Sequence, residues 1–600
     1  MDLDQKLKSL SLSQDEHVTV RRLQCANVVT DEDGLVRNCR NSSTKTCSSC
    51  YLVQYCGEDC QKAHWKAHKP DCKSEVSKES WVPGWQQENR TPDFIEANDD
   101  GPPTSYTFVG SFQKHLWGNV PAIDVLKLET NEGLKHQKDL HLMFAASGDL
   151  RNVLETVIGI PDTYRSTCHI LVNDRDQDIA IRNTVLLLMG ISSDVSLDQT
   201  VEAMIHIWYS TFLTDTNVNK VLLPALSLIQ DVYLKVKDKT TSTLYSKSWT
   251  FGGTTLRVAL EKDDWEDMYK LSLPSGLSAS QAQEVRRSVT LARKDHLDRH
   301  LFSQSCGYRV PITRFREDGM LLPFSTSRSS FTKPNPTFFR YPNKWPMMDS
   351  ADPESSWPLR AIWNLQIGQP RNDFYGKLFF YLQERLRRFV QKLRKSSFKI
   401  VILRQDAAQL PDSAKDLAFG KDGIDRIETS NIADLHYMGT VDVVRLFSPL
   451  LKSPKDNPHS TLITHYLNAA KNAHMWLTDA GPNPEYEKEL TEALTKVSRY
   501  RGFFWPTSNM DARILRSLYE RDLFINWDKY FNHYMKYLKF DQICNRFNVK
   551  IRERNTIVEK SPFRLKKNPD ENGAQEEFLV SSASNHGAHE RYLEWVRNSA

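Results

Sequence analysis

The sequence contains no apolar run long enough to cross a lipid bilayer, which takes about 18 residues or more. Its best apolar stretches, 184–191 and 221–229, are short enough to be buried helices or strands of a globular core. The first residues, Met1–Gln5, lack the basic segment and apolar stretch of a secretory signal. We therefore expect no membrane partner and an intracellular protein, located in the cytoplasm or the nucleus.

A large excess of charge is also missing, because 79 lysines and arginines are balanced by 75 aspartates and glutamates, for a formal charge of +4. Nucleic-acid binding usually relies on many uncompensated basic residues, so the composition argues against nucleic acid as a partner. An apolar fraction of 40% and a charged fraction of 26% are typical of globular proteins. A chain of 600 residues is too long for one hydrophobic core.

Several enzyme signatures are absent as well. The segment 251–254, Phe-Gly-Gly-Thr, does not form a phosphate-binding loop, because no glycine–lysine pair follows it. The asparagine-histidine-serine signature and the tyrosine-bearing closing motif of SET-type lysine methyltransferases are missing. No hydrolase elbow or kinase loop stands out. The sequence therefore leans away from an enzyme, without settling the question.

Cysteines are scarce outside one short segment, since seven of the ten lie between positions 25 and 72. We expect the other three, Cys168, Cys306 and Cys544, to be buried, inert thiols. In a reducing compartment, clustered cysteines more often bind metal than form disulfides. With one histidine, the seven supply eight candidate ligands, enough for two closed tetrahedral zinc sites. The candidates are Cys25, Cys39, Cys47, Cys50, Cys56, Cys60, His68 and Cys72.

The spacing within this segment supports metal binding. Cys47 and Cys50 form the tight turn that places two sulfurs on one ion. His68 and Cys72 are four residues apart on a predicted helix, so their side chains project from one face. So short a segment has little apolar surface to bury. Zinc, at roughly 10–16 kcal/mol per structural ion, would supply most of its folding free energy.

Parts of this segment, Cys47–Cys50, Tyr55–Gln61 and His64–Cys72, resemble the MYND zinc finger. The resemblance implies that other proteins are partners, because MYND fingers dock short proline-containing peptides. It also implies two interleaved zinc ions. One ion would take Cys25, Cys39, Cys56 and Cys60, and the other would take Cys47, Cys50, His68 and Cys72.

The chain departs from the MYND pattern in its first interval. The family usually has two residues between its first two cysteines, whereas thirteen separate Cys25 from Cys39 here. Residues 31–34, Asp-Glu-Asp-Gly, predict a turn within this insertion. His64 lies on the same helical face as His68, and we expect it to be a packing residue. If Cys25 does not bind zinc, His64 could complete the first site.

Strand-like and helix-like segments alternate after the finger, which predicts a parallel sheet. A helix with an apolar leucine stripe and a solvated basic face is predicted over 377–393. Four predicted strands each end in a polar or acidic residue, and a fifth candidate follows them. The five are 141–146, 168–172, 398–403, 424–429 and 461–467. This pattern fits a Rossmann-like, methyltransferase-like α/β domain with a large helical insertion.

The composition suggests where the domains begin and end. Prolines and glycines among polar residues predict a linker, and Trp81, Trp85 and Phe94 within it predict that it packs along a surface. The last part of the chain is rich in aromatic residues at helical spacing, with a loose polar tail over 568–590. We expect a variable N-terminus over 1–24, the finger over 25–72, the linker over 73–104, the α/β domain over 105–475 with its insertion at 192–396, and a helical C-terminal region over 476–600.

If this sheet binds S-adenosylmethionine, six residues at the ends of its strands are candidate contacts. We expect Gly148 and Asp149 beside the methionine part, Asp174 at the ribose, Asp406 at the adenine amine, and Ser430 and Asn431 facing the methyl group. Cofactor loops usually offer several glycines, however, and only Gly148 is present here. Asp149 can equally be a helix cap and Asp174 a turn residue.

The stretches 116–124, 144–152 and 430–434 resemble a fungal MYND-containing family. Its body carries an uncharacterised domain that also occurs in an axonemal dynein assembly factor. Two hypotheses follow. In the first, the protein is a zinc-binding interaction scaffold whose Rossmann-like body lacks catalysis. In the second, the body is a methyltransferase that uses S-adenosylmethionine.

Overall fold

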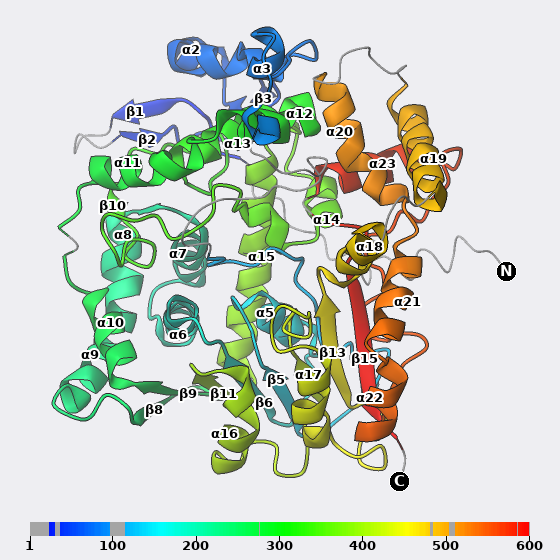
Figure 1. Ribbon diagram of the computed structural model, residues 1–600. Coiled ribbons are helices and arrows are strands. Elements are labelled where there is room, and N and C mark those ends of the chain that lie inside the picture. The colour runs from blue at the N-terminus through cyan, green and yellow to red at the C-terminus, as the bar shows by residue number, and fades with distance from the viewer. Residues whose placement is uncertain are drawn as a thin grey trace.

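The computed structural model describes residues 23–30, 36–96, 114–274, 276–479, 484–502, 511–584 and 586–598. The predicted turn at 31–34 and the end of the predicted linker lie outside these ranges. Within them, no helix combines the length and the hydrophobicity that a bilayer crossing requires. The finger lies at one end of a larger α/β body (Figure 1).

A sheet of nine strands forms the centre of the body (Figure 1). The six strands from β13 to β9 run parallel, β15 is antiparallel to both of its neighbours, and β8 is antiparallel to β9. From one edge to the other the strands are β14 (Val549–Ile551), β15 (Arg591–Arg597), β13 (Thr461–Tyr466), β12 (Arg426–Glu428), β5 (Leu140–Phe144), β6 (Cys168–Asn173), β11 (Phe398–Leu403), β9 (Thr254–Glu261) and β8 (Leu244–Phe251).

The expected α/β domain is confirmed, and all five predicted strands belong to this sheet. The central strands β5, β6 and β11 are mostly apolar because helices cover both faces of the sheet. In β5, Leu142 and Phe144 point into one core while Met143 points into the other. Each face of the sheet therefore has its own hydrophobic core.

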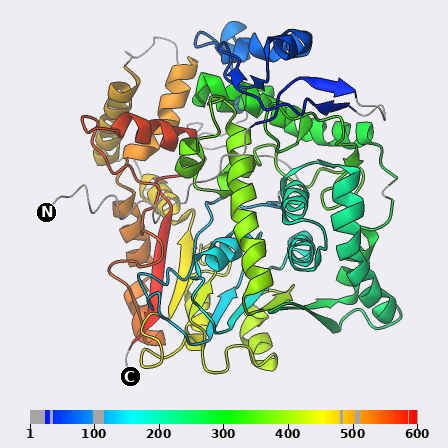
Figure 2. The same ribbon diagram turned by 180° about the vertical axis from the view of Figure 1, so that it is seen from behind.

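The first core lies under α5 (Arg151–Gly159), α6 (Gln177–Ser192), α7 (Leu197–Tyr209) and α15 (Phe374–Lys395). Helix α15 runs along the body as its longest helix (Figure 2). Its predicted apolar stripe is buried, because Leu382, Leu386 and Leu393 are inaccessible to solvent. The second core lies under α17 (Thr440–Phe447), α18 (Ala469–Asp479), α21 (Trp527–Tyr537) and α22 (Phe540–Phe547).

The predicted helical insertion is only partly helical. It includes α9 (Leu223–Val236), α10 (Lys262–Lys270), α11 (Ala279–Thr290), α12 (Lys294–Ser303), α13 (Cys306–Asp318) and α14 (Leu359–Asn364). Strands β8 and β9 also lie within it, and β9 pairs with β11 in parallel register. The alternation of Leu256, Val258 and Leu260 is the period-two signal of a strand. The segment predicted as a helical insertion therefore contains many helices but also adds two strands to the sheet.

The prediction of a helical C-terminal region with a loose tail was also wrong in part. Helices α19 (Pro484–Arg501) and α20 (Ala512–Glu520) precede α21 and α22, as expected. Strands β14 and β15 then join the central sheet, where Leu593 and Trp595 are fully buried. The segment expected to be loose contains α23 (Ala574–Ala583), whose Phe578 is buried against Tyr500. Burial of these apolar side chains orders the tail.

The described part of the predicted linker packs on the body, as its aromatic residues indicated. Trp85, in the short helix α3 (Gly84–Gln87), is buried and meets Phe94 edge to face at 5.5 Å between ring centroids. Arg90 donates two hydrogen bonds, of 2.5 and 2.7 Å, to the buried carboxylate of Asp295 in α12. The linker is therefore anchored to the helices that precede α13.

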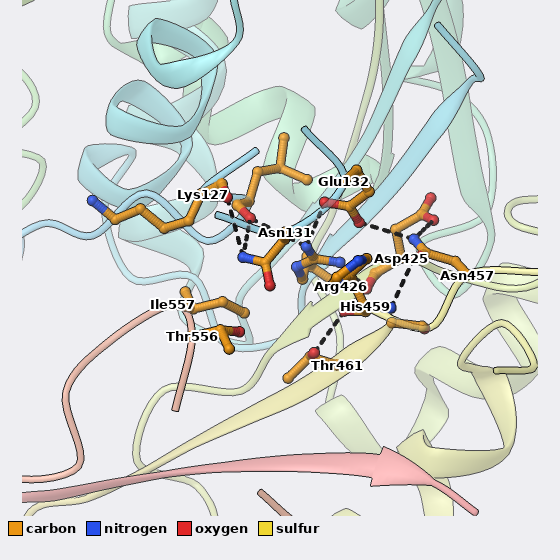
Figure 3. Close-up of polar contacts among 12 residues, drawn as sticks. Lys127, Asn131, Glu132, Asp425, Arg426, Asn457, His459, Thr461, Thr556 and Ile557 are labelled. Atoms are coloured by element: carbon orange, nitrogen blue, oxygen red, sulfur yellow. Dashed lines mark hydrogen bonds and ion pairs between the residues drawn. The ribbon is translucent and has the colours of Figure 1, made fainter. Parts of the chain in front are cut away.

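A buried charged network lies at the amino end of β12 (Figure 3). Arg426 donates to the carbonyl oxygens of Val125 and Leu126, each at 3.1 Å, and to the carboxylate of Glu132 at 2.8 Å. The amide of Asn457 donates to Glu132 at 2.9 Å and to Asp425 at 2.7 Å. Burial alone would raise the pKa of Glu132, but the charge of Arg426 brings it below the ordinary value. The network ties the segment before β5 to the sheet.

Candidate functional site

The finger comprises β1 (Val28–Thr30), β2 (Val36–Asn38), β3 (Lys45–Thr46), β4 (Gln54–Tyr55) and α2 (Glu58–Cys72). Its eight candidate ligands gather in two groups of four, and within each group all ligand atoms lie within 4.8 Å of one another. These are the groups that the MYND resemblance implies. One group is Cys25, Cys39, Cys56 and Cys60, and the other is Cys47, Cys50, His68 and Cys72.

The geometry of both groups fits zinc. Sulfurs bound to one tetrahedral zinc lie about 3.8 Å apart, because each Zn–S bond is about 2.3 Å long. The Sγ atoms of Cys39 and Cys56 are 3.9 Å apart, and those of Cys47 and Cys72 are 3.7 Å apart. Burial lowers the pKa of His68 to about 4, which keeps its imidazole neutral, as a metal ligand must be. The finger therefore has two Cys/His zinc-binding sites.

Cys25 completes the first group, so His64 is not needed there. The Nδ1 atom of His64 lies 3.0 Å from the hydroxyl of Tyr55, and its ring stacks on that of His68. The long interval after Cys25 forms the hairpin of β1 and β2, in which Val28 pairs with Asn38. Because a hairpin returns the chain to its starting point, Cys39 comes back beside Cys25.

The body holds the finger on the side of its tight turn. Asn372, just before α15, donates its side-chain amide to the carbonyl oxygen of Cys50 at 2.8 Å. The guanidinium of Arg371 lies 4.0 Å from the ring centroid of Tyr51. Arg314 on α13 forms an ion pair with Asp71 on α2. The finger is thus fixed to the body by contacts to both its turn and its helix.

A cavity of about 700 Å³ opens at the carboxyl ends of the parallel strands. The order of the strands reverses at this point. Strand β6, the next in the sequence, pairs with one side of β5, and β12 pairs with the other side. Ligands of open α/β sheets bind at such a switch point. All six residues predicted to contact a cofactor line this cavity, namely Gly148, Asp149, Asp174, Asp406, Ser430 and Asn431.

Gly148 and Asp174 form the wall between the ends of β5 and β6. Gly148 has φ of +55°, a conformation that glycine adopts at little cost. Its N–H donates to Oδ2 of Asp174 at 2.9 Å, and Oδ1 accepts from the N–H of Asp176 at 2.9 Å. Burial raises the pKa of Asp174. Asp174 is therefore both a turn residue and a cavity residue.

Asp149 has less freedom to bind a ligand. Its buried carboxylate accepts from the N–H of Gly118 at 2.8 Å, from Nε1 of Trp208 at 3.3 Å and from Nη1 of Arg151 at 2.6 Å. It is not the N-cap of α5, a position that Leu150 occupies. These bonds hold the segment around Gly118 against α5. Asp149 thus shapes the wall of the cavity.

The remaining predicted residues lie at the rim. Asp406 caps a short 3₁₀ helix by accepting from the N–H of Ala408 at 2.9 Å, and its side chain is exposed. Ser430 has φ of +49°, and its carbonyl oxygen accepts from the N–H of His465 at 3.0 Å. Asn431 follows it and is partly exposed.

Sequence reasoning missed several buried polar residues of the cavity. Glu428 is the last residue of β12, and burial raises its pKa to about 7. His465 in β13 forms a 3.0 Å hydrogen bond with Glu590 and stacks on Tyr592 of β15 at 4.3 Å. The predicted strand 424–429, Ile-Asp-Arg-Ile-Glu-Thr, contains three charged residues, and a charged side chain within a predicted buried strand was the available signal for Glu428. Tyr592 was missed because β15, the strand that carries it, was not predicted.

Comparison with family models and curated proteins gives two matched segments and two relatives. Residues 37–72 match the MYND finger, and residues 116–213 match a domain of unknown function, DUF4470. The chain is 27% identical over 231 residues to dynein axonemal assembly factor 3 of Danio rerio, covering 36% of this chain and 47% of that protein. It is 46% identical over 35 residues to histone-lysine N-methyltransferase ASHR1 of Arabidopsis thaliana, covering 6% and 7%.

The chain thus spans about half the length of the first of these relatives and a small part of the second. No solved structure matches it. The chain carries a MYND zinc finger and a DUF4470 domain, and it is distantly homologous to dynein axonemal assembly factor 3.

Proposed function

We propose that this protein is an interaction scaffold whose zinc finger docks a segment of a partner protein while the body fixes the orientation of the finger. A MYND finger indicates zinc binding and protein interaction. The observation that carries the proposal is Trp65 on α2, whose side chain is 38% exposed beside the second zinc site. Tryptophan is enriched among the residues that dominate binding at protein interfaces.

This proposal predicts that Trp65→Ala abolishes peptide docking. An array of short proline-containing peptides is screened with the wild-type protein, and the affinity of the best binder is then measured by fluorescence polarisation. Truncating a central aromatic anchor is expected to weaken binding by about tenfold or more. Tyr537→Ala is the control, because Tyr537 is an exposed aromatic residue on α21 of the body, away from the finger. Equal affinities of the Trp65→Ala and wild-type proteins would contradict the proposal.

The strand order supports a second candidate function, methyl transfer from S-adenosylmethionine. If the added strands β8 and β9 are left aside, the order β11-β6-β5-β12-β13-β15-β14 has its first strand in the middle and one antiparallel strand, β15, between two others. Class I methyltransferases have this arrangement. The short match to a histone-lysine methyltransferase adds no support, because it covers 7% of that protein.

The cavity has the size and lining that this ligand needs. Small-molecule sites usually measure about 300–1,000 Å³, and this one has about 700 Å³. Gly148 allows close approach to the methionine part, Asp174 faces the ribose, and Asp406 lies where the adenine amine would be. Ser430 and Asn431 would face the transferred methyl group. Asp149 does not contact the ligand here, since its carboxylate is held by internal donors.

Calorimetric titration with S-adenosylhomocysteine tests this second candidate. We expect wild-type protein to bind and Asp174→Ala to lose about tenfold or more in affinity, because a carboxylate that accepts from two hydroxyl groups is removed. Asp442→Ala, at an exposed carboxylate on α17, is the control and should bind normally. Thermal unfolding of each variant separates lost binding from lost folding. No heat and no thermal shift at millimolar ligand would reject the function.

A further inference from the structure

Glu428 is a deeply buried carboxylate of the cavity. Its side chain is 3% exposed, and Oε1 accepts from the N–H of Ser430 at 2.6 Å. Oε2 has no partner at hydrogen-bonding geometry among the described residues, although the side chain of Asn152 lies near enough to lower the pKa of Glu428. A buried acceptor left without a donor costs about 1–3 kcal/mol, so such atoms usually serve a purpose. Glu428 lines the cavity, which is the one place from which a donor can arrive.

The charges around Glu428 are otherwise engaged. Arg151, which lies near enough to lower the pKa of Glu428, pairs with Asp149 at 2.6 Å and donates to the carbonyl oxygen of Val120 at 2.8 Å. His465 is oriented by Glu590, at 3.0 Å. Within the described chain, Glu428 forms no ion pair of its own. The carboxylate therefore remains available to a ligand.

The position of Glu428 in the sheet indicates which end of S-adenosylmethionine it would face. It pairs in register with Phe144, the last residue of β5, so it lies directly at the switch point. It also holds the N–H of Ser430, the residue expected to face the methyl group. In the proposed orientation of the ligand, Glu428 lies beside Ser430 at the methyl end of the cavity.

We propose that Glu428 binds the methyl acceptor and that the accepting atom is a nitrogen bearing at least one hydrogen; this inference rests on the second candidate function. An N–H group supplies the donor that Oε2 lacks, whereas a thioether does not. A hydroxyl group also donates, but it is a weak nucleophile until it loses its proton, whereas an amine attacks through its lone pair while it still bears hydrogen. The acceptor nitrogen forms a bond to the methyl carbon, whose bond to the sulfonium sulfur breaks with its electron pair left on sulfur. The proton that the nitrogen loses passes to Oε2. A carboxylate with a pKa of about 7 is matched to that role near neutral pH.

Sinefungin provides a probe for this contact, because it carries a primary amine in place of the sulfonium methyl group. Its affinity is compared with that of S-adenosylhomocysteine, which has neither group, by calorimetry on the full-length zinc-loaded protein. We expect wild-type protein to prefer sinefungin by about tenfold, the effect of one charge-assisted hydrogen bond. Glu428→Gln keeps an acceptor for Ser430 and should lose the preference while binding S-adenosylhomocysteine as the wild type does.

The outcomes separate the two proposals. If wild-type protein binds neither compound, the methyltransferase function and this inference both fail. If both bind and Glu428→Gln still prefers sinefungin by about tenfold, the cavity keeps its proposed function and the role of Glu428 is wrong. If Glu428→Gln fails to fold, Glu428→Asp is used in its place. The aspartate side chain is one methylene shorter, so its carboxylate should not reach the amine of sinefungin. A retained preference in that variant overturns the inference in the same way.

Discussion

Replacing Cys47 with serine is expected to lower the zinc content of the purified protein from two equivalents to one or fewer. Serine does not replace a thiolate on zinc, and each structural zinc contributes roughly 10–16 kcal/mol to the folding of a finger. Helix α2 supplies ligands to both groups, Cys60 to one and His68 and Cys72 to the other, so loss of one ion loosens the second site. Elemental analysis by mass spectrometry gives the zinc content directly.

Cys306→Ser is the matched control for this experiment. Cys306 begins α13, outside both ligand groups, and its substitution should leave two zinc ions bound. Limited proteolysis should cleave the finger of the Cys47→Ser protein and spare the sheet, to which the finger contributes no strand. Full zinc content in the Cys47→Ser variant would show that these sulfurs do not hold the metal.

Replacing Arg426 with methionine is expected to destabilise the body by about 3–5 kcal/mol, the usual effect of removing one partner from a buried ion pair. Arg426 is fully buried, and its loss removes the positive charge that pairs with Glu132 and a donor to the carbonyl oxygens of Val125 and Leu126. Methionine fills a similar volume, so the loss reports on charge and hydrogen bonding more than on packing. Urea unfolding, followed by tryptophan fluorescence, measures the change in free energy of unfolding.

Arg445→Met supplies the comparison for this experiment. Arg445 pairs with Asp442 on α17, and both side chains are 50% exposed, so the variant should differ from wild type by less than about 1 kcal/mol. Equal destabilisation by the two substitutions would mean that the network at the amino end of β12 contributes no more than a surface pair. The double variant Arg426→Met with Glu132→Gln should recover part of the loss, because the uncompensated carboxylate is gone.

The parts of this structure that sequence predicted are those with a local signal. Cys47 and Cys50 are close in sequence, and thiolates at zinc-finger spacing have one main use. Strands β5, β6 and β11 are mostly apolar runs followed by polar residues, and the carboxyl ends of parallel strands meet at one edge. That geometry brings Gly148, Asp174 and Ser430 to one cavity although they are far apart in sequence.

The parts that sequence did not predict depend on contacts between distant segments. Nothing local to Asp149 shows that Gly118 and Trp208 will donate to its carboxylate. Strand β15 is mixed in polarity, and its Glu594 is buried because the backbone N–H groups of Thr556 and Ile557 donate to it. From sequence alone, a charged residue is expected to be exposed, because the partners that replace its water when it is buried cannot be seen in the sequence. The same effect concealed Glu428.

The place of β15 in the sheet sets the order of events during synthesis. This strand separates β13 from β14, and it is made after all other strands of the sheet. Until the ribosome has released residue 597, β13 ends the sheet with unpaired backbone groups, a state that favours aggregation. The wall of the cavity that contains Tyr592 is also incomplete. The sheet of the body is therefore complete only after residue 597 has been translated, and until then β13 is an open edge.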